Sequence, residues 1–146
     1  MNTSIFHEFN ENKEIVLQNL LHAKSWESRL RIIVQLGKSL PEFPVEKKNK
    51  DGLIENCENE VFLTGVYQPQ TDSLYFFADT NVRILKGLIA FLFLFCQGGS
   101  PEAIYNLDFE LKLKEYQVIR HLSRTRNDGL KKVVNTLQET ASQYMK

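Results

Sequence analysis

The sequence predicts an α+β fold, in which a small antiparallel β-sheet is packed by helices in two layers. Segments with apolar side chains at the 3.6-residue spacing of a helix lie on both sides of a short central region. That region holds two runs of β-branched and aromatic residues, 61–67 and 74–78. Residues 68–73 between these runs are rich in turn formers, so we expect the two runs to pair as antiparallel strands.

Two helices are expected before the hairpin, over about residues 11–22 and 25–36. The second carries apolar side chains on one face, at Trp26, Leu30, Ile33 and Val34. Gly37 is placed to end this helix. The polar segment 38–52 is predicted to be a long loop, followed by a possible short third strand at 53–55.

An apolar helix is expected after the hairpin, over about residues 81–97. Asp79 and Thr80 are residue types that cap a helix N-terminus, and we expect them to do so here. Gly98 and Gly99 are predicted to close the helix.

Three more helix starts follow. Ser100 and Pro101 open one helix, with serine at the cap and proline in the first turn. Asp108 is predicted to cap a short helix that runs to Tyr116. The last helix is expected over about residues 124–145, with one apolar face made by Leu130, Val133, Val134, Leu137, Ala141 and Tyr144.

Length and charge narrow the class of protein. The 146 residues fit a single domain, 1–146. Lysine plus arginine and aspartate plus glutamate number 18 each, so no net field favours nucleic acid or a membrane surface.

The first twelve residues lack the apolar core of a signal peptide, and the apolar stretch 87–96 is far shorter than the roughly 20 residues that span a bilayer. With only two cysteines, we expect a reducing, cytoplasmic location.

Cys57 is the residue most suited to chemistry. It follows Asn56 in a polar segment just before the first strand, whereas a structural cysteine prefers apolar surroundings. The nearby acids Asp51, Glu55, Glu58 and Glu60 disfavour the thiolate. This setting suits a carrier thiol that is activated on docking better than a self-activated nucleophile. The residues alone leave a reactive thiol and an unreactive loop cysteine both open.

The remaining cysteine and the histidines predict no cofactor site and no metal site. Cys96 lies in an apolar helix and is interpreted as a core thiol. His7, His22 and His121 have no ligand spacing with each other or with the cysteines. The sequence also lacks a glycine loop for phosphate and a nucleophile elbow.

Five segments, taken in order, resemble the SufE/CsdE family of sulfur-acceptor proteins. They are residues 26–27 (WE), 36–41 (LGKSLP), 54–62 (IENCENEVF), 79–88 (DTNVRILKGL) and 121–130 (HLSRTRNDGL). The resemblance implies a SufE/IscU-like fold, with Cys57 as the sulfur-accepting residue. This residue would take persulfide sulfur from a pyridoxal-phosphate-dependent cysteine desulfurase of the SufS or CsdA type. The protein would stimulate that enzyme and pass the sulfur to a cluster scaffold or another acceptor.

The resemblance also implies which residues contact the desulfurase. Arg126 matches a family arginine near the acceptor loop, and Asp79 matches an acid before the long helix. Asn81 stands where some relatives carry an acid implicated in docking, and Glu58 adjoins the acceptor cysteine. For Asp79 the helix cap described above is the alternative interpretation.

Three departures from the family pattern indicate a divergent member with its own partner. Asn56 replaces the usual glycine before the cysteine, and asparagine tolerates a left-handed backbone best among the other residues. Phe62 replaces a common tryptophan, and Ala78 replaces a glycine.

Two other functions stay open. The protein could regulate a desulfurase without carrying sulfur, or it could be a redox enzyme that uses Cys57 and Cys96 as a dithiol pair. A carrier depends on Cys57 alone, a regulator on neither cysteine and a redox enzyme on both. The apolar setting of Cys96 argues against the redox enzyme.

Overall fold

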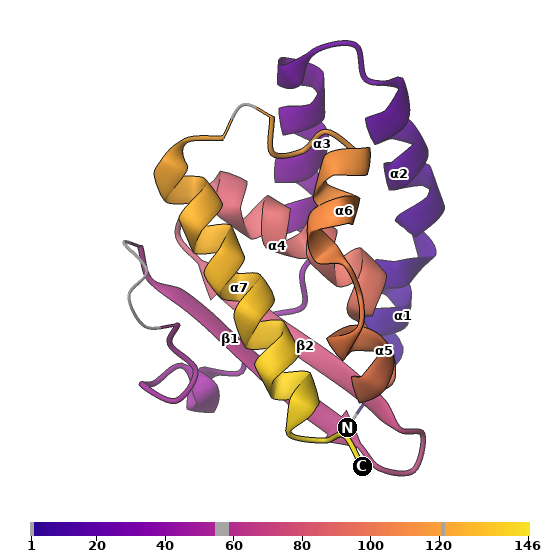
Figure 1. Ribbon diagram of the computed structural model, residues 1–146, viewed down its shortest axis with the longest axis vertical. Helices are drawn as coiled ribbons and strands as arrows, with labels where there is room; N and C mark the ends of the chain where they lie inside the picture. The colour runs from indigo at the N-terminus through magenta and orange to yellow at the C-terminus, as the bar shows by residue number, and fades with distance from the viewer. Residues whose placement is uncertain (1, 55–58, 121) are drawn as a thin grey trace.

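Strands β1 (Val61–Gln68) and β2 (Ser73–Thr80) form an antiparallel hairpin, with Val61 opposite Thr80 and Gln68 opposite Ser73 (Figure 1). The computed structural model describes residues 2–54, 59–120 and 122–146. The predicted pairing of the two runs is confirmed, and both strands extend slightly beyond the predicted ends. Of the possible third strand at 53–55, Leu53 makes an antiparallel β-bridge to Phe62, and residue 55 lies outside the described residues.

Alternation of side chains gives each face of the hairpin its own core. Leu63, Leu74 and Phe76 point into the main core, where helices α4 (Arg83–Cys96) and α7 (Arg124–Ser142) cover the sheet. The opposite face carries a smaller cluster, made by the buried residues Phe6, Phe43, Tyr75 and Phe77. Because both faces are covered, β2 is buried along almost its whole length. The predicted α+β fold is confirmed.

The outer edge of β2 is closed by the chain that leaves α4. The buried amide of Gln97 donates to the Phe76 carbonyl and accepts from the Phe76 N–H, both at 2.7 Å. The Gly98 N–H donates to the Leu74 carbonyl, and the Leu74 N–H donates to the Gly99 carbonyl, both at 2.9 Å. Gly98 adopts φ 78°, which favours glycine. The two glycines therefore follow the helix as predicted and also pair the strand edge.

The chain begins with two helices where one was predicted. Helix α1 (Ser4–Glu11) precedes α2 (Lys13–His22), and it lies beside the sheet because Phe6 and Phe9 are buried. Helix α3 (Trp26–Gly37) agrees with the prediction, and the Ser25 side chain accepts from the Ser28 N–H at 3.1 Å. The long loop after it contains one 3-10 turn, η1 (Val45–Lys47).

Helix α4 is the centre of the main core, and α3 packs closely against it. A Cβ atom on Gly87 would lie 2.2 Å from the Ile33 carbonyl oxygen, and one on Gly37 would lie 2.8 Å from the Gly87 nitrogen. Only glycine permits this approach of the two backbones. The contact holds α3, and the loop that follows it, at the start of α4.

The predicted N-caps of α4 are wrong. Asp79 and Thr80 belong to β2, and the cap position is Val82, which makes no side-chain cap hydrogen bond. The strand extends because its pairing with Val61 and Phe62 satisfies the backbone of these residues. The Thr80 hydroxyl accepts from the Val82 N–H at 3.3 Å, so it orders the turn into the helix without capping it.

The remaining helices confirm the predicted starts. Helices α5 (Pro101–Tyr105), α6 (Phe109–Glu115) and α7 are capped by the side chains of Ser100, Asp108 and Ser123. Helix α7 ends at Ser142, three residues earlier than expected. Its predicted apolar face is buried at Leu130, Val133, Leu137 and Ala141.

Candidate functional site

The predicted acceptor residue Cys57 lies outside the described residues, as do Glu55, Asn56 and Glu58. The candidate site is therefore built from the residues on both sides of this segment. Ile54 precedes it, and Asn59 follows it. Both flanks lie next to the end of the sheet where β1 begins (Figure 1).

Backbone hydrogen bonds join the two flanks. The Ile54 N–H donates to the Val61 carbonyl at 2.8 Å, and the Leu63 N–H donates to the Gly52 carbonyl at 2.7 Å. Ile54 and Val61 are both buried. These hydrogen bonds hold the chain before the segment, at Gly52 and Ile54, against the first residues of β1 after it.

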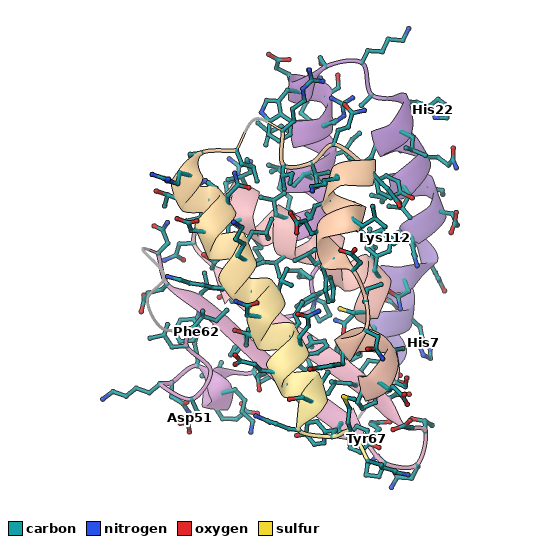
Figure 2. The ribbon with its side chains drawn as sticks, in the orientation of Figure 1. His7, His22, Asp51, Phe62, Tyr67 and Lys112 are labelled. Carbon is teal, nitrogen blue, oxygen red and sulfur yellow. The ribbon has the colours of Figure 1, made fainter. Side chains whose placement is uncertain are left out.

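Phe62 anchors the loop that leads into the segment. Its ring lies 5.9 Å from the ring of Phe43, and the Lys48 ammonium lies 5.6 Å from its centroid. Phe43 is buried against the sheet. Figure 2 shows Phe62 on the same side of the molecule as Asp51 of this loop. An aromatic residue at position 62 is therefore used in packing, which is consistent with phenylalanine in place of tryptophan.

Asp79 lies opposite Phe62 in the sheet and connects three segments. Its carboxylate accepts from Lys48 of the loop at 2.8 Å and lies 3.4 Å from the ammonium of Lys86 in α4. Burial alone raises the pKa of Asp79, but the hydrogen bond from Lys48 and the charges of both lysines outweigh it, so this pKa is below its ordinary value. The same hydrogen bond raises the pKa of Lys48. The Asp79 carboxylate and the Lys48 ammonium therefore stay ionised at neutral pH.

Of the other predicted partner residues, Asn81 and Arg126 lie in the described part of the chain. Asn81 is exposed between β2 and α4. Arg126 is half-buried in the first turn of α7, where its N–H donates to the Ser123 hydroxyl. Among the residues that the structure describes, no ion pair engages its guanidinium. In Figure 1 this turn and the start of β1 both lie toward the left of the molecule.

A polar cleft of about 510 Å³ lies beside Ile54. One wall is residues 51–54 with Leu63, and the other comes from α7. The α7 side chains are those of Lys132, Asn135, Thr136 and Glu139. Because charged groups of both signs line it, the cleft suits a polar group rather than an apolar ligand.

Three features of the site were not predicted from the sequence: Lys48, Lys86 and the polar wall of α7. Lys48 lies in a lysine-rich run, and the sequence carries no signal for which of these lysines reaches Asp79. Lys86 follows Asp79 by seven residues. The two side chains meet only because the chain leaves β2 and begins α4 between them.

Cys96 is confirmed as a buried core thiol, with 2% of its surface exposed. Burial raises its pKa far above the ordinary value, so the thiolate does not form at neutral pH.

The part of the chain that the structure describes holds neither a metal-binding cluster nor a membrane-spanning helix. In residues 2–54, 59–120 and 122–146, no group of three or more His, Cys, Asp or Glu side chains is arranged to hold a metal ion. Within the same ranges, no helix combines the length and apolarity needed to cross a bilayer.

Comparisons with known proteins found a family whose model matches this chain and a solved structure with a similar fold. The model of the SufE family, described as an Fe-S metabolism associated domain, matches residues 14–141. A solved structure, the solution structure of a hypothetical protein from Thermus thermophilus, is similar in fold with a TM-score of 0.69. The identity is 16%, and the match covers 92% of this chain and 93% of that one.

We predict that Asp79→Asn destabilises the fold in a pH-dependent way. The pKa of Asp79 is lower in the folded chain, so its contribution is present above the unfolded-state value near 4 and is lost as the pH falls through the folded-state value. At about pH 7 the variant should unfold about 2–4 °C below the wild type, since partly exposed pairs contribute modestly. Thermal unfolding followed by circular dichroism measures the difference.

The matched control is Glu110→Gln, because Glu110 pairs with Lys114 at 3.4 Å on an exposed face. This variant should unfold at the wild-type temperature. A deficit of Asp79→Asn that persisted unchanged at about pH 2, below the ordinary carboxyl range, would show that its charge is not what stabilises the loop.

Proposed function

The chain belongs to the SufE family, whose domain is associated with iron–sulfur metabolism, and from this premise we propose that it is a sulfur acceptor that uses Cys57. The donor is a pyridoxal-phosphate-dependent cysteine desulfurase of the SufS or CsdA type. The protein accepts the sulfur, stimulates the donor and passes the sulfur to a cluster scaffold or another acceptor. It acts as an accessory protein of the desulfurase and is not a free-standing enzyme.

The transfer is a thiol–disulfide type of exchange. The Cys57 thiolate attacks the outer sulfur of the donor's persulfide, and a new S–S bond forms as the donor's S–S bond breaks. The donor cysteine leaves as a thiolate, and Cys57 becomes a persulfide. Sulfur moves at the same oxidation level, so the step needs no external oxidant or reductant. Loss of the persulfide frees the desulfurase for another turnover.

The match of the family model over residues 14–141 carries the proposal, because this range includes Cys57 and the five sequence blocks around it. The anchored flanks add support. A carrier thiol must meet a partner's persulfide in alignment. Hydrogen bonds to β1 fix Ile54 on one side of the segment, and β1 itself begins on the other side.

We propose that Arg126, Asp79, Asn81 and Glu58 contribute to the surface that meets the desulfurase. Arg126 and Asn81 have side chains at the surface for such a contact. Asp79 already holds two lysines, so we propose that it acts through the ion-paired surface that it forms with Lys48 and Lys86. A free thiol carrier also requires a reducing compartment such as the cytoplasm.

The alternative is a regulator that binds a desulfurase without carrying sulfur, with Cys57 incidental. The dithiol redox enzyme is disfavoured, because the buried Cys96 thiol has a raised pKa and little access to solvent. The carrier and the regulator differ in whether sulfur becomes attached to this chain.

The proposed function predicts one added sulfur atom on the wild-type protein after incubation with a cysteine desulfurase and cysteine. Intact-mass measurement under non-reducing conditions detects it. Cys96→Ser should gain the sulfur, and Cys57→Ser should not. If no variant gains sulfur from any donor of the SufS or CsdA type, the regulator is the better account.

We also predict that Arg126→Ala slows persulfide formation on Cys57 at least about fivefold, because a charge at the rim of an interface mainly affects association. Its unfolding temperature should change by less than about 2 °C, since no ion pair is lost within the described chain. Arg124→Ala, an exposed neighbour in the same helical turn, is the control and should transfer sulfur normally. Equal losses of transfer and stability would assign Arg126 a structural role.

A further inference from the structure

A groove of about 1270 Å³ runs between α2 and α3 and reaches the first turn of α4. The two helices lie side by side at the upper end of the molecule (Figure 1). Ile15 and Val16 line the α2 wall, while Leu30 and Val34 line the α3 wall. None of these residues belongs to the candidate site around β1.

The walls of the groove carry apolar side chains that the core does not fully bury. Ile15 is 63% exposed, which is high for isoleucine. On α3, the predicted apolar face is only partly used by the core, because Ile33 is fully buried whereas Leu30 and Val34 are half-buried. Side chains placed at helical spacing and left open to a groove are typical of a surface that another protein covers.

The rim of the groove is positively charged. Arg31, Lys38 and Arg83 line it and are exposed, and Glu27 is the only acidic residue among the described lining residues. The whole chain is neutral, so this excess is local. Such a rim attracts an acidic partner and repels a basic one.

The shape of the groove favours a helix over a small molecule. Sites for small molecules are usually enclosed pockets of roughly 300–1,000 Å³. This groove is larger, at about 1270 Å³, and is bounded by two helices along its length. Here the walls are helices of 10 and 12 residues. At a rise of about 1.5 Å per residue they extend roughly 15–18 Å, which matches about three turns of a bound helix.

We propose that this groove binds an acidic amphipathic helix of a protein partner. The apolar face of the bound helix packs against Ile15, Leu30 and Val34, and its carboxylates face Arg31, Lys38 and Arg83. The proposal goes beyond sulfur transfer and does not depend on Cys57.

The test uses a synthetic helical peptide of about 18 residues, with leucines on one face and glutamates on the other. Its counterpart carries lysine in place of each glutamate. Fluorescence anisotropy should show the acidic peptide binding at least about tenfold more tightly, with affinity falling as salt rises. Chemical-shift changes in amide spectra should map to α2, α3 and the start of α4.

Matched variants locate the interaction. Arg31→Glu with Lys38→Glu should weaken the acidic peptide at least about tenfold. Arg120→Glu, an exposed charge reversal outside the groove lining, should keep the affinity within about twofold. Thermal unfolding checks that each variant is folded. The Cys57→Ser protein should bind the peptide like the wild type, which separates this proposal from sulfur transfer.

The proposal is overturned if the acidic peptide fails to bind, if the acidic and basic peptides bind equally or if the double charge reversal leaves the affinity unchanged. Shift changes confined to other elements would also overturn it.

Discussion

The burial of α4 is the constraint on which the other elements depend. Every residue from Leu88 to Phe93 is fully buried. Because consecutive residues point to different sides of a helix, every side of α4 must be covered. Burying each large apolar side chain stabilises the fold by about 1.5–3 kcal/mol. The sheet, α3 and α7 supply that cover. The closest approach is at Gly87, where the backbone of α3 takes the space that a side chain would need.

The position of the candidate site follows from this arrangement. The main-core face of the hairpin is committed to α4 and α7, which leaves Phe62, Tyr75 and Phe77 on the other face. The loop after α3 covers part of that face with Phe43 and is tied to it by the Lys48–Asp79 ion pair. The same loop leads directly to Ile54. Core packing, the loop and the flanks of the proposed acceptor cysteine are therefore mechanically linked.

Much of this fold could be predicted because its signals are local. The helical spacing of apolar residues predicted α3 and α7, and two runs of β-branched and aromatic residues around a turn-rich segment predicted β1 and β2. Phe6 and Phe9 lie at helical spacing, but the short, polar α1 was missed because its stability comes from packing on the sheet. The predicted cap at Asp79 was wrong because strand pairing and two lysines, both distant in sequence, outweigh a local preference for capping.

The candidate site was predictable only where the motif is continuous in sequence. The block around Cys57 is continuous in sequence and suggested the proposed acceptor, and the family match covers it. The Lys48–Asp79–Lys86 contacts instead join segments that only the fold brings together. No local signal selects Lys48 from its neighbouring lysines. The apolar face of α3 was predicted from the sequence. Only the structure shows which residues of that face line the groove and are not buried in the core.

A carrier and a regulator are separated by the rate of alanine production by a cysteine desulfurase, measured with saturating wild-type protein or with the Cys57→Ser variant. Removal of sulfur from the donor persulfide requires an accepting thiol. We expect the wild type to accelerate turnover, whereas the Cys57→Ser protein should bind the enzyme and compete with the wild type without accelerating it. Equal acceleration by both proteins would contradict the carrier mechanism.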